Sequence, residues 1–338
     1  SDFQRDFDRL VFSSPFRRLQ NKTQVFPLPG SIFVHNRLTH SLEVSCVGKS
    51  LAGEVLLLLG EKYASEPWVA RMDAIPEIVA AACLAHDLGN PPFGHSGERT
   101  ISAYFSEGKG QQLKPHFNEW QWNDLVHFEG NANSFRSLVH QFKGRRVGGF
   151  AMTYSTLASI VKYPYASLYA GEKGKFGFFS SEQEHFEKIA TELGLIKLGE
   201  GRYCRHPLVY LVEAADDICY RILDFEDAVA MDIFSEQQVT ALFRKILTPR
   251  HRDESAGRPL QWFRGVAIRD LVEAFTAQFE RHYDAILSGT LEGELKDYLE
   301  SGQREAFDEI KRLYGVLFSH HRKVIAEIGS YGQFSGIL

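Results

Sequence analysis

The segment at residues 76–87 constrains the fold most, because its helical pattern is apolar on nearly every side. Its apolar positions include Ile78, Val79, Ala82 and Cys83. A helix that is hydrophobic all round has to be buried by neighbouring elements. Gly89 and the pair Pro91-Pro92 then end the pattern. The sequence therefore predicts a buried central helix that carries His86 and Asp87 in its last turn.

Helical periodicity also dominates the rest of the chain. Besides residues 76–87, we expect helices at about residues 41–59, 96–105, 118–142, 150–162, 182–193, 207–223, 235–247, 260–287 and 303–328. Strand patterns are weak, and the best candidates are Ser31–Val34 and Gly174–Phe179. Glycine-rich segments at 106–116, 171–177 and 199–203 are typical of loops or small hairpins. The predicted fold class is all-α, one large helical domain with peripheral lobes and minor peripheral hairpins.

Charge and cysteine content narrow the possible functions. The net charge is −5 and no long stretch is strongly one-signed, which argues against a dedicated nucleic-acid or membrane-surface protein. The four cysteines form no CxxC pair, which favours reduced thiols in a cytoplasmic protein. The longest aliphatic run, residues 55–59, is too short to span a membrane, and the chain shows no signal-peptide pattern. It starts without Met, so trimming at one or both ends has to be allowed for.

The adjacent pair His86-Asp87 is the first candidate for chemistry. Neighbours on a helix point about 100° apart, but in the last turn both can reach one ion lying off the helix end. An ionised Asp87 at the buried end of an apolar helix is costly unless it is paired or bound to a metal. Imidazole with carboxylate suits Mn, Fe, Co, Ni or Zn, and a carboxylate-rich site with water suits Mg. A His-Asp dipeptide is also common by chance, so a purely structural role stays open.

Two further residues could complete a metal site. His40 lies at the start of the preceding predicted helix, and Asp216 interrupts an otherwise apolar helical pattern together with Asp217. The alternative for the two aspartates is a solvated helix face. The wide separations along the chain do not decide between these interpretations.

The residues around these positions form longer sequence motifs. They are Asn36-Arg-Leu-Thr-His-Ser-Leu-Glu-Val44, Ala85-His-Asp-Leu-Gly-Asn-Pro-Pro-Phe-Gly-His-Ser-Gly-Glu98, His127-Phe-Glu-Gly-Asn131, Leu157-Ala-Ser-Ile-Val-Lys-Tyr-Pro164, Lys175-Phe-Gly-Phe-Phe179 and His206-Pro-Leu-Val-Tyr-Leu-Val-Glu-Ala-Ala-Asp-Asp-Ile-Cys-Tyr220. In this order they closely resemble the deoxyguanosine triphosphate triphosphohydrolases, a bacterial branch of the HD superfamily of metal-dependent phosphohydrolases. The resemblance covers roughly residues 10–330. The animal SAM-and-HD-domain dNTP hydrolases are more distant relatives.

The resemblance implies a reaction and a metal site. Water attacks the α-phosphorus of a deoxynucleoside triphosphate, with dGTP favoured and other dNTPs possible, and releases deoxynucleoside and tripolyphosphate. The implied metal ligands are His40, His86, Asp87 and Asp216. The ion is divalent, with Mn²⁺ or Mg²⁺ favoured and Co²⁺, Ni²⁺, Fe²⁺ or Zn²⁺ as alternatives. Such an ion polarises a phosphoryl oxygen and lowers the pKa of bound water.

The resemblance also implies catalytic residues. His95 and Glu98 are three positions apart and share a helix face, and a carboxylate fixes the tautomer of a neighbouring histidine. We expect His95 to transfer a proton to or from the attacking or leaving oxygen. His127 matches a family histidine that approaches the α-phosphate. A polar pair at a helix N-terminus and a capping or core histidine are the structural alternatives.

Substrate contacts follow from the same resemblance. Gln24 and Arg37 match positions that meet the deoxyribose and the phosphates. Tyr220 and Asp224 follow Asp216 on one helix face, which in the family packs beside the sugar and reads its 3′-hydroxyl. Lys162 and Lys175 are expected to contact the triphosphate. Core packing for the tyrosine, and plain surface exposure for the lysines, are the alternatives.

Domain organisation and partners complete the expectations. Residues 1–230 are expected to form the HD catalytic core with an N-terminal substrate-binding segment, and residues 231–338 a helical lobe packed on it, with truncation allowed for. The relatives imply a homo-oligomer with sites for allosteric dNTP or single-stranded DNA, and no membrane partner. The competing functions are an HD-type phosphodiesterase or 5′-nucleotidase, and a regulatory protein that binds dNTP or single-stranded DNA.

Overall fold

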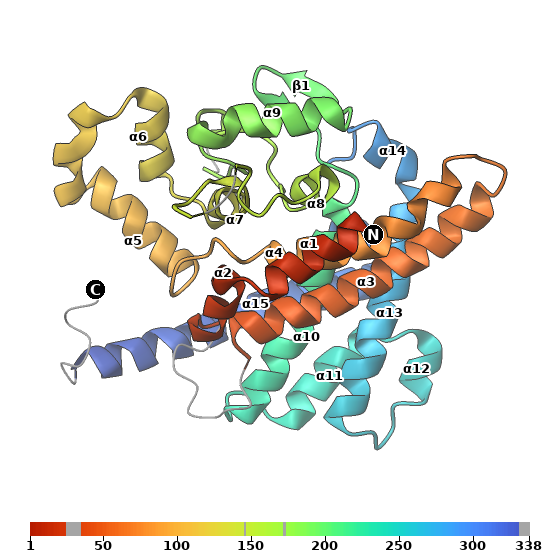
Figure 1. Ribbon diagram of the computed structural model, residues 1–338. Coiled ribbons are helices and arrows are strands. Elements are labelled where there is room, and N and C mark those ends of the chain that lie inside the picture. The colour runs from red at the N-terminus through yellow and green to blue at the C-terminus, as the bar shows by residue number, and fades with distance from the viewer. Residues whose placement is uncertain (25–34, 145–146, 172–173, 331–338) are drawn as a thin grey trace.

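The computed structural model describes residues 1–24, 35–144, 147–171 and 174–330, and this part of the chain is predominantly helical (Figure 1). The α-helices are α1 (Asp2–Val11), α2 (Ser14–Arg18), α3 (Arg37–Lys62), α4 (Ile75–Ala85), α5 (His95–Ser106), α6 (Glu119–Val126), α7 (Gly130–Val139), α8 (Tyr154–Ser159), α9 (Gln183–Glu192), α10 (Val209–Ala230), α11 (Glu236–Ile246), α12 (Pro249–Asp253), α13 (Leu260–Arg281), α14 (Tyr283–Leu287) and α15 (Ser301–Ser330). Short 3-10 helices are η1 (Leu19–Asn21), η2 (Val69–Ala74), η3 (Lys109–His116), η4 (Ser167–Tyr169), η6 (Ser180–Glu182) and η7 (Leu295–Tyr298). The predicted all-α class is confirmed.

The strand predictions have mixed outcomes. The glycine-rich segment at 199–203 does form part of a small antiparallel hairpin, β1 (Lys197–Gly199) with β2 (Arg202–Tyr203). The prediction of a strand at Gly174–Phe179 is wrong, because only Phe178 forms an isolated bridge there, to Ala166. The predicted strand at Ser31–Val34 lies outside the described residues.

Two long predicted helices are interrupted in the structure. The segment expected at 118–142 splits into α6 and α7, because Glu129 adopts an extended backbone and its side chain caps Asn131 N at the start of α7. The segment at 260–287 similarly splits into α13 and α14 at His282. The apolar periodicity continues across both breaks, and for this reason the sequence pattern did not predict them.

The centre of the molecule is α4, packed against α3 and α10. Every residue from Ile78 to Ala85 is buried, as the all-round apolar pattern predicts. Complete burial of Val79 and Leu84 stabilises the fold by roughly 1.5–3 kcal/mol each. A Cβ on Gly48 of α3 would lie 2.5 Å from Cys83 Sγ of α4, so a glycine permits the close approach of these two helices.

The C-terminal helices pack directly on this centre. Helix α13 contacts α3 and α10, and α15 contacts α10 and α11 (Figure 1). One continuous hydrophobic cluster runs from Leu10 to Leu317. The proposed division at residue 230 stays a prediction. None of the described helices combines the length and the apolar character that crossing a membrane requires.

Candidate metal centre

His40, His86 and Asp87 converge on one point from two different helices. His40 lies in the first turn of α3, His86 caps the end of α4, and Asp87 follows it. One ligand atom from each lies within 4.8 Å of the other two. Asp216 of α10 joins them, with its Oδ1 3.0 Å from His40 Nε2 and 3.6 Å from His86 Nε2. The fold therefore brings together the four metal ligands that the sequence resemblance implies.

The start of α3 is built so that His40 occupies a fixed place. Asn36 caps the helix, and its side chain accepts hydrogen bonds of 3.0 Å from Leu38 N and Thr39 N. The Thr39 hydroxyl in turn accepts from Asn36 N at 3.0 Å, which completes a capping box. The backbone of the first turn is thus held from both sides, and the buried imidazole of His40 projects from it.

The His86 imidazole shows what the site is suited to bind. Its Nδ1 lies 2.6 Å from the Cys83 carbonyl oxygen, so Nδ1 carries the hydrogen and Nε2 is left with a lone pair. That Nε2 is buried without a hydrogen-bond partner among the described residues. It faces Asp87 Oδ1 and Asp216 Oδ1, each 3.6 Å away. In the neutral imidazole this lone pair would face two carboxylates, which is unfavourable unless a proton or a metal ion lies between them. These residues therefore fit a divalent metal ion, which would displace the proton.

The electrostatics of the four groups favour a bound cation. Burial by itself would lower the pKa of His86, but the Asp87 and Asp216 carboxylates outweigh it and raise this pKa to about 9. Burial would raise the pKa of Asp216, and the two imidazoles instead hold it well below its ordinary value. The Asp216 side chain is 44% exposed, so this face of the site is open to a substrate.

Arg37 contacts Asp87 on the side away from the histidines. Its guanidinium, which is buried, donates a hydrogen bond to Asp87 Oδ2, while Asn90 Nδ2 donates to Oδ1. Burial alone would raise the pKa of Asp87, and the positive charge of Arg37 is the main influence that keeps it below its usual value. In this structure Arg37 orients the carboxylate, and its contact with substrate phosphates stays a prediction.

Gly89 allows the loop after His86-Asp87 to lie against α7. A Cβ at this position would lie 2.0 Å from Ser134 N and 2.3 Å from Gly130 O, which are backbone atoms that cannot rotate away. Its own backbone N donates to Ser134 Oγ at 2.9 Å. Gly89 is therefore required by the close packing of this loop against α7, in addition to its role in ending the helix.

We expect Gly89→Ala to destabilise the protein by at least about 1–3 kcal/mol, because overpacking forces the backbone to move. Urea unfolding followed by circular dichroism measures this change. Gly53→Ala on α3 is the matched control, since nothing lies within 4 Å of its added Cβ. The control is expected to gain up to about 1 kcal/mol from better helix propensity. Equal unfolding midpoints for Gly89→Ala and the wild type would contradict this account.

The pair His95 and Glu98 lies at the start of α5. His95 Nδ1 is 2.7 Å from Glu98 Oε2, and Glu98 Oε1 accepts a 2.8 Å hydrogen bond from Gly130 N. Burial would raise the pKa of Glu98, but the hydrogen bond to His95 and the charge of Lys175 lower it. An ionised Glu98 therefore orients His95 with Nδ1 as donor and Nε2 as acceptor. The His95 side chain is 74% exposed and available to a substrate.

His127 and Lys175 lie at a cavity beside this pair. The cavity has a volume of about 440 Å³, and its lining includes Glu98, His127, Glu129 and Lys175. Lys175 Nζ is 2.6 Å from Glu129 Oε2 and 3.9 Å from Glu98 Oε2. Glu129, which the sequence singled out only weakly, thus holds the predicted phosphate-binding lysine.

The remaining predicted substrate residues differ in their surroundings. Lys162 is not a free surface lysine, since its Nζ pairs with Glu213 at 2.9 Å and Glu294 at 2.8 Å. Lys22 donates to the Leu88 and Asn90 carbonyls, at 3.2 and 2.6 Å, so the N-terminal segment reaches the loop after His86-Asp87. Gln24 follows two residues later, and its Oε1 is buried without a partner among the described residues.

Tyr220 and Asp224 share one face of α10 with Asp216, as their spacing predicts, and both contact Tyr314. The rings of Tyr220 and Tyr314 stack at 4.2 Å, and the Tyr314 hydroxyl bonds to Asp224. Sequence reasoning missed Tyr314, because no motif marks a residue that reaches the site from a distant helix. Asp217, by contrast, points to Arg221 and Lys296 rather than to the metal ligands.

A helical fold with a His-Asp pair at the end of its central helix, and a further His and Asp beside it, defines an HD-domain protein. The family model described as HD domain matches residues 37–148. A protein of Pseudomonas aeruginosa (strain LESB58), named deoxyguanosinetriphosphate triphosphohydrolase-like protein, is 40% identical over 98% of this chain and 77% of its own length. A protein of Synechocystis sp. with the same name is 36% identical over 96% and 76%. A deoxyguanosinetriphosphate triphosphohydrolase of Serratia proteamaculans is 32% identical over 99% and 75%.

The chain belongs to the deoxyguanosinetriphosphate triphosphohydrolase family of HD-domain hydrolases. It is accordingly a hydrolase, and the family resemblance found in the sequence motifs is confirmed. HD domains imply a divalent metal ion, and the group His40, His86 and Asp87 is arranged to hold one.

Proposed function

We propose that the protein hydrolyses deoxynucleoside triphosphates, dGTP in preference, to deoxynucleoside and tripolyphosphate with the help of a divalent metal ion. The observation that carries the proposal is the buried His86 Nε2, which lies 3.6 Å from an oxygen of each of the Asp87 and Asp216 carboxylates. Such a group of atoms binds a cation, and a cation beside an open face can contact a phosphate. The relatives named deoxyguanosinetriphosphate triphosphohydrolase support the choice of substrate.

The metal would be held by His40, His86, Asp87 and Asp216, and Mn²⁺ or Mg²⁺ is favoured. When bound, it supplies charge to polarise an α-phosphate oxygen and to acidify a water molecule. Arg37 keeps Asp87 ionised and oriented toward this ion. The Cys83 carbonyl keeps His86 in the tautomer that presents Nε2.

His95 transfers the proton in this proposal. Glu98 holds Nδ1, so the exposed Nε2 is the atom that exchanges a proton with the attacking or leaving oxygen. His127 and Lys175 are proposed to meet the phosphates, which is supported by their position in the lining of the adjacent cavity. Lys162 is proposed to contact the triphosphate, and Gln24, Tyr220 and Asp224 are proposed to meet the sugar.

A product assay tests the reaction. Purified protein with Mn²⁺ or Mg²⁺ is incubated with each dNTP alone and in pairs, and the phosphorus products are separated by ion-exchange chromatography. Tripolyphosphate from dGTP supports the proposal, and turnover only in the presence of a second dNTP would reveal activation by that nucleotide. Inorganic phosphate from a monophosphate, or a linearised cyclic nucleotide, would instead support the phosphodiesterase or 5′-nucleotidase alternative. Binding without turnover would support a regulatory protein.

Metal binding is expected to depend on pH, because the ion displaces a proton. With its pKa at about 9, His86 holds a proton at pH 7 in the metal-free protein, and only the neutral imidazole binds a metal. Affinity should therefore rise about tenfold per pH unit from pH 6 to pH 8 and level off above pH 9. Calorimetric titration with Mn²⁺ in two buffers of different ionisation enthalpy measures the release of about one proton. A pH-independent affinity would contradict this assignment.

The cellular setting and the assembly state form a separate part of the proposal. We propose a cytoplasmic homo-oligomer, on which dNTP or single-stranded DNA acts as an allosteric ligand. Free cysteines in all four positions agree with a reducing compartment. Light scattering during gel filtration, with and without dNTP, tests the oligomeric state directly.

A further inference from the structure

Tyr314 of α15 reaches from the C-terminal part of the chain onto the middle of α10. Its side chain is only 3% exposed. Its ring stacks on that of Tyr220 at 4.2 Å with an interplanar angle of 14°, and it meets the Phe225 ring edge-on at 5.5 Å. Tyr220, a proposed sugar contact, is therefore held by a ring from a helix far along the chain.

The Tyr314 hydroxyl links two groups of α10. It lies 2.6 Å from Asp224 Oδ2 and also within hydrogen-bond distance of the Tyr220 carbonyl oxygen. A hydroxyl has one hydrogen and two lone pairs. It can donate to one of these oxygens, and it can accept from Asp224 when that carboxyl is protonated. Either way, the hydroxyl fixes the position of Oδ2.

Asp224 depends on this contact because it is otherwise poorly compensated. It is 1% exposed, and within the described residues no lysine or arginine forms an ion pair with it. Burial raises its pKa to about 7, with Asp227 adding to this effect and His40, the Tyr314 hydrogen bond and His35 opposing it. A buried carboxyl with so few partners needs the Tyr314 hydroxyl to stay in one rotamer.

The location of these groups indicates a functional role for the contact between Tyr314 and Asp224. Asp216, Tyr220 and Asp224 lie at successive turns on one face of α10, so a substrate whose phosphate lies at the metal site beside Asp216 extends toward the other two. Resting on the proposed function, we infer that Tyr314 is a positioning residue of the sugar site. It holds Asp224 Oδ2 so that Oδ1 accepts a hydrogen bond from the 3′-hydroxyl, and its ring holds Tyr220 beside the sugar.

The test is Tyr314→Phe, which keeps the ring and removes the hydroxyl. Steady-state kcat and KM are measured for dGTP and for 2′,3′-dideoxy-GTP with Mn²⁺, at a temperature where circular dichroism shows each variant folded. We expect the preference for dGTP in kcat/KM to fall about tenfold, mainly through KM, because a hydrogen bond to a carboxyl is lost. The kcat/KM for 2′,3′-dideoxy-GTP should stay within about twofold of the wild-type value, since this substrate lacks the 3′-hydroxyl that Asp224 would bind.

A double-mutant cycle separates this role from simple packing. In the Asp224→Asn background, Tyr314→Phe should leave the ratio of kcat/KM for dGTP to kcat/KM for 2′,3′-dideoxy-GTP unchanged. The carboxylate that would accept the hydrogen bond from the 3′-hydroxyl is already replaced in that background. Tyr210→Phe is the matched control. It removes another buried hydroxyl at α10, one that bonds to the Leu291 carbonyl at 3.4 Å, and it should leave the ratio at the wild-type value.

The outcomes distinguish this inference from the proposed function. Wild-type protein that hydrolyses no dNTP overturns the proposed function and this inference with it. An active wild type whose substrate ratio is unchanged by Tyr314→Phe overturns the inference alone. An equal loss of activity on both substrates does so too, because it indicates a packing role only.

Discussion

His86→Ala is expected to hydrolyse dGTP at about one thousandth of the wild-type rate or less. A metal ion acting on a phosphoryl group contributes several kcal/mol to catalysis, and each 1.4 kcal/mol corresponds to about a factor of ten. The substitution removes an imidazole nitrogen that lies 3.6 Å from both the Asp87 and the Asp216 carboxylate. Without this nitrogen the site has one ligand fewer and binds the ion more weakly. Calorimetry should therefore also show a loss of Mn²⁺ affinity.

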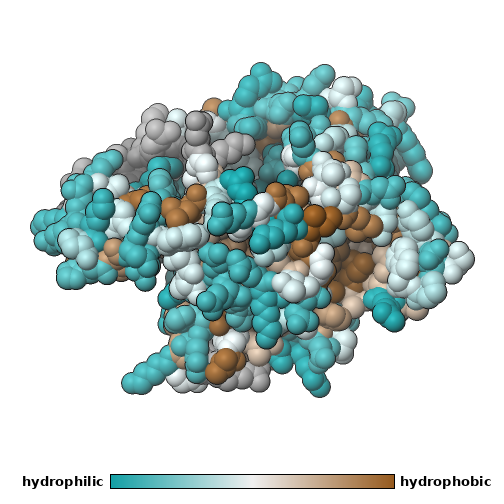
Figure 2. Space-filling model, turned by 90° about the horizontal axis from the view of Figure 1, so that it is seen from above, coloured by the Kyte–Doolittle hydropathy of each residue, from teal (hydrophilic) through white to brown (hydrophobic). Residues whose placement is uncertain are grey.

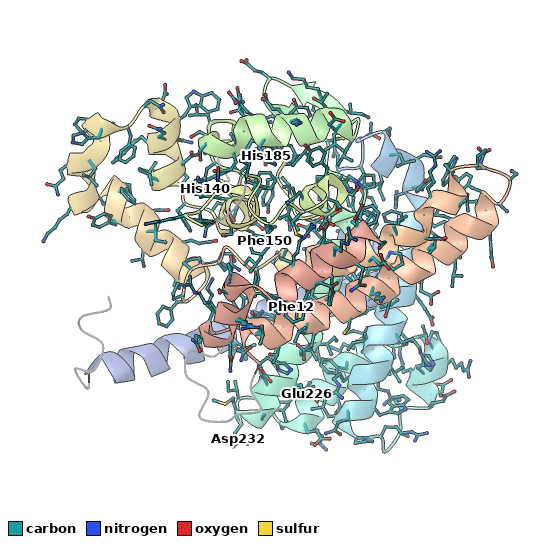
Figure 3. The ribbon with its side chains drawn as sticks, viewed as in Figure 1. Phe12, His140, Phe150, His185, Glu226 and Asp232 are labelled. Carbon is teal, nitrogen blue, oxygen red and sulfur yellow. The ribbon has the colours of Figure 1, made fainter. Side chains whose placement is uncertain are left out.

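Far-ultraviolet circular dichroism of His86→Ala is expected to match that of the wild type, because the buried residues of α4 are unchanged. Asp87→Ala should also abolish hydrolysis, but it is a less clean variant, since it leaves the buried Arg37 without its carboxylate. His185→Ala is the control. His185 lies on α9 and packs against Phe135 with ring centroids 6.2 Å apart (Figure 3). Full activity of His86→Ala would refute a metal-centred mechanism.

His95→Ala is expected to lower kcat by about a hundred- to ten-thousandfold, the usual contribution of a general acid or base. Metal affinity should stay at the wild-type value, because His95 is not among the four groups around the ion. Glu98→Gln should cause a smaller loss, since the imidazole remains and only its orientation by the carboxylate weakens. Rapid-quench measurement of a single turnover assigns these losses to the chemical step rather than to product release.

Thr100→Ala provides the control for α5. Thr100 is exposed on the same helix, and its hydroxyl donates a hydrogen bond of 2.8 Å to the Ser96 carbonyl oxygen. Its rate should equal that of the wild type. If His95→Ala bound Mn²⁺ normally and retained full kcat, proton transfer would have to be assigned to another group, with His127 the next candidate at the adjacent cavity.

Seen from above, the molecule is largely hydrophilic, with apolar residues gathered in limited patches (Figure 2). Lys175 and Lys162 are each paired with glutamates in the structure. A triphosphate would have to compete with those glutamates, so both lysines are expected to exchange partners when substrate binds.

The local pattern of the sequence determined the helical class and the buried helix at residues 76–87. These features depend on neighbours a few residues apart, which is the range over which periodicity and capping act. The same pattern could not place the break between α6 and α7. There the apolar spacing continues, and only the extended backbone of Glu129 interrupts the helix.

For the site, the sequence indicated which residues to expect there, because the motifs around His40, His86 and Asp216 resemble those of one family. Only the tertiary structure decided how their atoms face each other. The tautomer of His86 depends on the Cys83 carbonyl, the pairing of Lys162 depends on Glu294, and the position of Asp224 depends on Tyr314. The last two contacts join residues some ninety or more positions apart, and packing between helices sets them without leaving any mark on the local sequence.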